Sequence, residues 1–136
     1  MLRVYISLLL LLSATHIFSA EYAVIANKNM KDLSQTQIKA IFLKKLTIID
    51  DTKMVPVSLG ARDKLRENFE KNILKMNFQR LKSYWSKQHY LGRRPPLSMK
   101  SEESVKAFVK KVDGAIGYIE KSAIDNDIKI LYEWKD

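Results

Sequence analysis

Segments typical of strands and segments typical of helices alternate along this chain, and this order restricts its fold more than any other feature. Short apolar runs at 22–26 and 54–59 predict two buried strands, and the runs at 115–119 and 128–132 predict two more. Residues with helical periodicity occupy the stretches between the first three runs. The predicted order is strand, helix, strand, three helices, strand, strand. This order indicates the α/β class, with a small, mainly parallel sheet flanked by helices.

Residues that cap helix N-termini mark where the predicted helices begin. Ser34 and Gln37 have the spacing of a capping box, and we expect a helix over 35–44. Asn77 and Ser101 are the predicted caps of two later helices. Ahead of Asn77, apolar residues recur at helical spacing and predict one long helix; they are Leu65, Phe69, Ile73 and Met76.

Proline and turn residues predict where the second strand begins and where the third helix ends. Pro56 has no amide hydrogen, so we expect the second strand to begin near it or to have a free edge there. Asp50-Asp51 predicts a turn before that strand. The segment 92–96, with its two prolines, cannot continue a helix and predicts a stiff, basic loop.

The N-terminal segment has the order of residues that a secretion signal needs. Arg3 precedes an apolar run over 4–12, and Ser19-Ala20 supplies small residues before the polar Glu21. The apolar run is shorter than the about 20 residues of a membrane-spanning helix. We therefore expect 1–20 to be a cleaved signal peptide and 21–136 to form a single exported domain. An uncleaved N-terminal anchor is the alternative.

Charge and cysteine content limit the partners of such a domain. The chain has 24 Lys and Arg against 15 Asp and Glu, and only Arg3 of these precedes residue 21, so 21–136 keeps a net charge of +8. This excess favours anionic partners such as phosphate-like ligands or acidic surfaces, or a solvated basic surface. Export makes nucleic acid the least expected partner. The chain has no cysteine, which excludes disulfides and cysteine-based metal sites.

The sequence offers little for catalysis. His89 is the one histidine of 21–136, and no carboxylate lies at helical spacing from it. The adjacent pairs Asp50-Asp51 and Glu102-Glu103 are typical of a turn and of a helix start, whereas acid–base work needs carboxylates in different environments. No Gly-rich phosphate loop is present. We expect a binding module without catalytic residues, metal or cofactor, not an enzyme.

The best candidate for a binding site is the junction between the second strand and the long helix. Helix N-termini present free amides and a positive dipole end, and arginine adds a two-pronged donor for phosphate or carboxylate. An ordinary charged first turn would look similar, and Asp63 would repel an anion unless it is paired. Arg93 and Arg94, in the proline-stiffened loop, are expected to contribute from further out. The predicted anion-binding residues are Ser58, Arg62, Lys64, Arg66, Arg93 and Arg94.

Several segments, in their order, resemble periplasmic phosphate-binding proteins of ABC transporters. The segment 33–43 is similar to the family's "L-x-x-x-Q-L-x-x-I-F", and 114–120, Gly-Ala-Ile-Gly-Tyr-Ile-Glu, is similar to "G-A-I-G-Y-V-E". Val55-Pro56-Val57 and Arg66-Glu67-Asn68-Phe69 correspond to the family's next strand and helix. The match covers nearly all of 22–120 and resembles the second lobe of these proteins and short stand-alone proteins similar to it.

The resemblance implies a single lobe of the type II periplasmic binding-protein fold (a PBP domain) located in the periplasm. In the two-lobed family, phosphate lies between the lobes and is held partly by a Gly-Ser-Gly-Thr turn that opens a helix. Arg62-Asp63-Lys64-Leu65 stands in the place of that turn here, and the first lobe has no counterpart.

Two functions therefore stay open at the level of sequence. The first is a substrate-binding protein-like module for transport or sensing that binds phosphate or a similar small anion. The second is an accessory protein without a ligand, which docks on a sensor, receptor or porin in the envelope. In that case a homodimer could replace the missing lobe.

Overall fold

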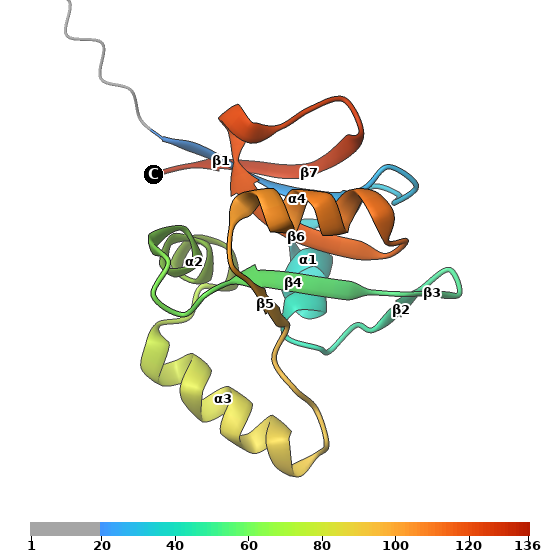
Figure 1. The fold of residues 1–136 in the computed structure, drawn as a ribbon. Coiled ribbons are helices and arrows are strands. Elements are labelled where there is room, and N and C mark those ends of the chain that lie inside the picture. The colour runs from blue at the N-terminus through green and yellow to red at the C-terminus, as the bar shows by residue number, and fades with distance from the viewer. Residues whose placement is uncertain (1–19) are drawn as a thin grey trace, which may run out of the picture.

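The computed structural model describes residues 20–136, so the predicted signal peptide lies, except for Ala20, outside the described residues (Figure 1). The main sheet and its helices comprise β1 (Glu21–Asn27), α1 (Gln35–Phe42), β4 (Val55–Leu59), α2 (Lys64–Phe69), α3 (Phe78–Tyr90), β5 (Leu97–Met99), α4 (Glu102–Lys111), β6 (Ala115–Glu120) and β7 (Ile128–Lys135). The smaller elements are β2 (Ile48–Ile49), β3 (Thr52–Lys53), the π-helical segment η1 (Glu70–Leu74) and the 3-10 turn η2 (Lys121–Ala123).

The five strands of the main sheet lie in the order β5-β4-β6-β1-β7. β4 is parallel to both β5 and β6, whereas β1 is antiparallel to both β6 and β7. Four strands consequently run in one direction and β1 alone runs in the other. The α/β class and the mainly parallel sheet flanked by helices are confirmed. The short edge strand β5 and the β2–β3 hairpin have no counterpart in the predicted order.

Helices cover both faces of the sheet, and two successive residues of β6 show which helix lies on which face. Successive residues of a strand point to opposite faces. At Gly117, an added Cβ would lie 2.6 Å from Val105 of α4. The ring of Tyr118 instead lies against Phe42 of α1 and Phe69 of α2. Hence α4 packs on one face, in front of the sheet in Figure 1, while α1 and α2 pack on the other.

The core beneath α1 and α2 is built around aromatic rings. The rings of Phe69 and Tyr118 are stacked with their centroids 4.1 Å apart, and Phe42 meets Phe69 edge-on at 4.7 Å. Trp134 of β7 extends the cluster, with its ring 6.0 Å from that of Phe69. All four side chains are buried. Their contacts fix α2 on the sheet, and α2 carries two of the predicted binding residues, Lys64 and Arg66.

The predicted caps are confirmed. The Ser34 hydroxyl accepts a hydrogen bond from the Gln37 amide, and the Gln37 side chain accepts one from the Ser34 amide, which closes the capping box of α1. The side chains of Asn77 and Ser101 cap α3 and α4 by accepting a hydrogen bond from the amides of Arg80 and Ser104.

Pro56 lies in the first half of β4, before the pairing with β5 begins at Val57. The preceding amide, that of Val55, donates to Gly114 on the β6 side. Because consecutive amides of a strand point in opposite directions, the missing amide of Pro56 falls on the side where β5 has not yet begun. The strand begins close to Pro56, as the sequence predicts. The turn at Asp50-Asp51 is also present, as a tight hairpin turn in which both residues have positive φ.

The prediction of one long helix from Leu65 to Met76 is wrong, because this stretch is not a continuous α-helix. The α-helix ends at Phe69, the π-helical segment Glu70–Leu74 follows, and Lys75 then adopts a left-handed φ of 57°. Leu65, Phe69 and Ile73 are nevertheless buried, as their periodicity indicates. A π-helical turn contains more residues than an α-helical turn, so apolar spacing does not distinguish the two here.

Candidate functional site

The predicted site lies where β4 ends and α2 begins, at the carboxyl end of a parallel strand. Ligands of open α/β sheets commonly bind at this end. Gly60 and Ala61 connect the two elements, and Asp63 caps α2. Six residues were predicted to bind an anion here, and the structure gives them three different environments.

Ser58 lies inside the protein. It is 8% exposed, and its hydroxyl is 2.6 Å from the hydroxyl of Tyr118. The Tyr118 hydroxyl also accepts a hydrogen bond from the Leu59 amide, at 3.1 Å. Burial raises the pKa of Tyr118 to about 12. Ser58 thus anchors the end of β4 to β6 through Tyr118.

Arg66 is half-buried and holds the start of α2 against β4. Its guanidinium donates to the carbonyl oxygen of Leu59 at 3.0 Å, and its Nε lies 3.5 Å from the Glu70 carboxylate. Burial raises the pKa of Glu70, and the charge of Arg66 opposes that rise. Arg66 therefore already has two partners within the protein.

Arg62 and Lys64 are exposed, and neither forms an ion pair with any residue in 20–136. Between them, the Asp63 carboxylate accepts a hydrogen bond from the Leu65 amide at 2.8 Å and so occupies a helix amide that an anion would use. A second carboxylate lies nearby: burial raises the pKa of Glu102, and Asp63 is among the neighbouring acids that raise it further.

Arg93 and Arg94 are exposed in the loop that follows α3. Arg93 donates to the Gln88 side chain at 3.1 Å. The next two residues, Pro95 and Pro96, line a cavity of about 20 Å³ together with Ser58 and Arg66. This volume suits one water molecule, not a phosphate group. The structure thus brings Ser58, Arg66 and the two prolines together, and leaves four cations on the surface.

The sequence-based prediction missed Tyr118 as a partner of Ser58, and Glu102 as a second acid near the start of α2. A tyrosine within a buried apolar strand needs a hydrogen-bond partner, and this was the available signal for Tyr118. Nothing in the local sequence indicates that Glu102, 39 positions after Asp63, is close to it in space. Within residues 20–136, no cluster of His, Asp and Glu could hold a metal ion, and no helix is long and apolar enough to span a membrane.

No protein-family model matches the sequence, and no curated protein matches it significantly. Solved structures do. The structure superposes on a putative phosphate ABC transporter substrate-binding protein with bound phosphate from Clostridium perfringens with a TM-score of 0.67, at 25% identity. The chain has the fold of phosphate-binding proteins. An ABC-type phosphate transport receptor from Vibrio cholerae has the same fold, with a TM-score of 0.65 at 18% identity.

The chain is shorter than the proteins that it matches. The superposition covers 82% and 84% of this chain, but only 44% and 47% of the Clostridium and Vibrio proteins. The predicted resemblance and fold class are confirmed at the level of the fold. The proteins matched are binding proteins, which agrees with the expectation of a binding module. The six predicted anion contacts stay a prediction.

Proposed function

We propose that this chain is a periplasmic, phosphate-binding-protein-like module that binds phosphate or a similar small oxyanion without catalysing a reaction. One observation carries the proposal: its fold matches a substrate-binding protein that was solved with bound phosphate. The exposed Arg62 and Lys64 lie at the carboxyl end of β4, where such sheets commonly bind their ligands. The signal peptide at 1–20, the single domain over 21–136 and transport by an ABC system belong to the same proposal.

Binding at this site is expected to be weak, for reasons that the geometry provides. Asp63 and Glu102 place negative charge beside the start of α2, and Asp63 occupies one of its amides. Arg66 and Ser58 already have partners inside the protein. Arg62 and Lys64 are left to supply the attraction, with Arg66 as an inner contact and Arg93 and Arg94 further out.

Titration calorimetry with phosphate at constant ionic strength tests the proposal with three variants. Replacing both exposed cations, Arg62→Gln with Lys64→Gln, should weaken binding by about tenfold or more. The variant Asp63→Asn keeps a capping side chain but removes the repelling charge, so it should strengthen binding. The control, Lys82→Gln with Lys111→Gln, removes the same charge elsewhere and should bind as the unmodified protein does.

The proposed site is wrong if Asp63→Asn leaves phosphate affinity unchanged and both double variants lose affinity equally. That result would show that only the net charge of the protein attracts phosphate. Unchanged affinity in the Arg62 and Lys64 variant would place the ligand elsewhere.

One observation favours a second function, that of an accessory protein that docks on an envelope protein and has no ligand. The polar groups that would hold an anion, namely the Ser58 hydroxyl, the Arg66 guanidinium and the Leu65 amide, are all bonded within the protein. A complete lack of calorimetric response to phosphate, sulfate and small carboxylates, together with a stoichiometric protein partner in envelope extracts, would support this function over the first.

A further inference from the structure

A cationic groove lies between α3 and the end of α1. It is a groove of about 310 Å³, and we call it the α1–α3 groove. Its lining residues are Lys39, Leu43, Lys45, Met76, Arg80, Ser83, Tyr84 and Lys87. None of them belongs to the six residues predicted for the site at α2. The groove is therefore a separate feature of the surface.

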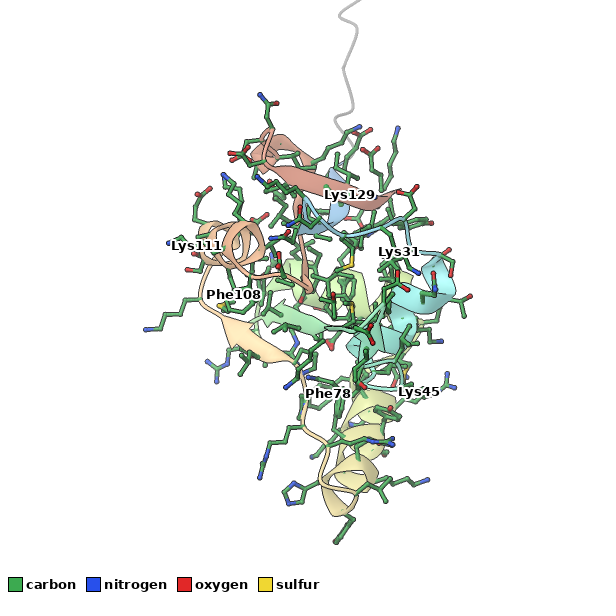
Figure 2. All side chains as sticks on the ribbon, turned by 90° about the vertical axis from the view of Figure 1, so that its right-hand side faces the viewer. Lys31, Lys45, Phe78, Phe108, Lys111 and Lys129 are labelled. Carbon is green, nitrogen blue, oxygen red and sulfur yellow. The ribbon has the colours of Figure 1, made fainter. Side chains whose placement is uncertain are left out.

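Four of the eight lining residues are cations, and none is an acid. Lys39 lies on α1, Lys45 in the segment that follows it, and Arg80 and Lys87 lie seven positions apart on α3. Positions that are seven apart lie on the same face of a helix, so both α3 cations are on the groove side. Figure 2 shows Lys45 beside the upper part of α3.

The four cations lack the carboxylate partners that some basic side chains of the protein have. Lys106, Lys110, Lys121 and Lys129 each pair with a carboxylate. Among residues 20–136, none of the four groove cations has a carboxylate oxygen within ion-pair distance. Unpaired like charges that face one groove repel one another, and an anion bound between them would relieve that repulsion.

Contacts on the floor of the groove hold its two sides together. The Tyr84 hydroxyl of α3 donates to the carbonyl oxygen of Leu43, at the end of α1, at 2.5 Å. The ammonium group of Lys45 lies 5.8 Å from the centre of the Tyr84 ring, within the range of a cation–π contact. These contacts keep the groove formed in the absence of a ligand.

The neighbouring hollow at the start of α3 has a different character. It is larger, at about 570 Å³, and two acids, Glu67 and Glu70, line it together with Lys71 and Lys75. Mixed charge of this kind does not select for an anion. The α1–α3 groove, by contrast, is lined by cations alone among its charged residues.

We propose that the α1–α3 groove binds a small soluble polyanion that carries two or more phosphate or comparable oxyanion groups. A single phosphate group carries a charge of about −2 at most near neutral pH, which cannot neutralise four cations from three segments. A ligand with linked phosphate groups can contact both walls of the groove at once. This proposal does not rest on the phosphate site proposed at α2.

Calorimetry with inorganic tripolyphosphate as the probe tests it, at constant ionic strength. The protein should bind tripolyphosphate at least about tenfold more tightly than inorganic phosphate. The variant Arg80→Gln with Lys87→Gln should lose about tenfold in tripolyphosphate affinity, because both side chains line the groove and Gln keeps a good helix former on α3. The matched control, Lys82→Gln with Lys111→Gln, removes the same charge outside the groove and should change affinity less than about twofold.

The site at α2 provides a second control. Arg62→Gln with Lys64→Gln should leave tripolyphosphate binding intact even if it abolishes phosphate binding, so the two proposals can fail separately. Amide signals of the groove segments, 39–45 and 80–87, should shift on addition of tripolyphosphate. Circular dichroism and the melting temperature report whether each variant is folded.

Three results would overturn the proposal. Equal losses in the groove variant and the Lys82 and Lys111 control would mean that diffuse charge attracts tripolyphosphate. Unchanged affinity in the groove variant would place the ligand elsewhere. Binding to vesicles of anionic phospholipid that needs Arg80 and Lys87, without binding to tripolyphosphate, would show that the groove takes lipid headgroups and not a soluble ligand.

Discussion

At the scale of single residues, Tyr118 joins the fold to the candidate site. Its hydroxyl contacts both the Ser58 hydroxyl and the Leu59 amide, and its ring stacks on Phe69. The side chain is fully buried. One residue of β6 thus fixes the end of β4, which leads into α2. A substitution at this residue should therefore affect the candidate site.

Tyr118→Phe removes the hydroxyl and leaves two buried polar groups without their partner. Unsatisfied buried groups cost about 1–3 kcal/mol each, so the free energy of unfolding should fall by about 2 kcal/mol. Denaturant unfolding measures this loss. Ser58→Ala is the matched control, since it leaves the bond from the Leu59 amide to Tyr118 in place and should cost less. A larger loss in Ser58→Ala would contradict this role of Tyr118.

The same substitution should change the response to alkaline pH. The pKa of Tyr118 is about 12 in the folded protein and 10.0 for an unperturbed tyrosine. Above pH 10 the unfolded chain loses this proton before the folded protein does. The ionisation of Tyr118 therefore leaves the free energy of unfolding unchanged below pH 10. As the pH rises from 10 toward 12, it lowers that free energy by up to about 1.4 kcal/mol per pH unit. In Tyr118→Phe this part of the fall should disappear from a series of unfolding curves at pH 9 to 12. An unaltered alkaline profile would show that Tyr118 does not cause it.

At the scale of elements, close packing of α4 on β6 depends on a glycine. A Cβ at Gly117 would lie 2.6 Å from a methyl group of Val105 and 3.2 Å from one of Val57. The absence of a side chain at this position therefore allows the helix to approach the sheet. In the sequence, the motif that contains Gly117 showed only a resemblance to a known family. The structure gives the physical reason for a glycine at this position.

Gly117→Ala should lower the free energy of unfolding by about 1–3 kcal/mol, because the added methyl group overpacks the interface between α4 and the sheet. Val105→Ala, which removes the methyl group nearest to it, should also destabilise the protein on its own. The double variant should be less destabilised than the sum of the two single variants, since one change makes room for the other. Strict additivity in thermal or denaturant unfolding would contradict the proposed contact.

At the scale of the whole molecule, the two ends of the described chain complete the sheet. β7 pairs with β1 along nearly its entire length, and Figure 1 shows the C-terminus beside the start of β1. Trp134 packs against Tyr22 with their rings 5.4 Å apart, and its indole nitrogen donates to Asn68 of α2. The last strand therefore connects the edge of the sheet to the aromatic core and to the helix at the candidate site.

Removing residues 128–136 should prevent cooperative folding, because it exposes one edge of β1 and takes Trp134 out of the core. Near-ultraviolet circular dichroism of the truncated protein should show no fixed aromatic environment. Trp134→Phe serves as the milder comparison: it keeps β7, loses the bond to Asn68 and should remain folded with a lowered melting temperature. A truncated protein that melts as sharply as the intact one would contradict this role of β7.

The sequence by itself determined the fold class, most of the element boundaries and the caps, because periodicity and cap residues act over a few neighbouring positions. Ser34, Asn77 and Ser101 cap their helices as predicted. The sequence also placed Arg62 and Lys64 at the junction of β4 and α2, since that junction is local.

Only the tertiary structure decided how the polar groups at the site are paired. The Ser58 hydroxyl lies against Tyr118, 60 residues later, and Asp63 lies near Glu102. The α1–α3 groove likewise combines Lys39 and Lys45 with Arg80 and Lys87, which are about 40 positions apart. Whether charges attract, repel or remain unpaired depends on distances across the fold. The spacing of residues along the sequence does not give these distances.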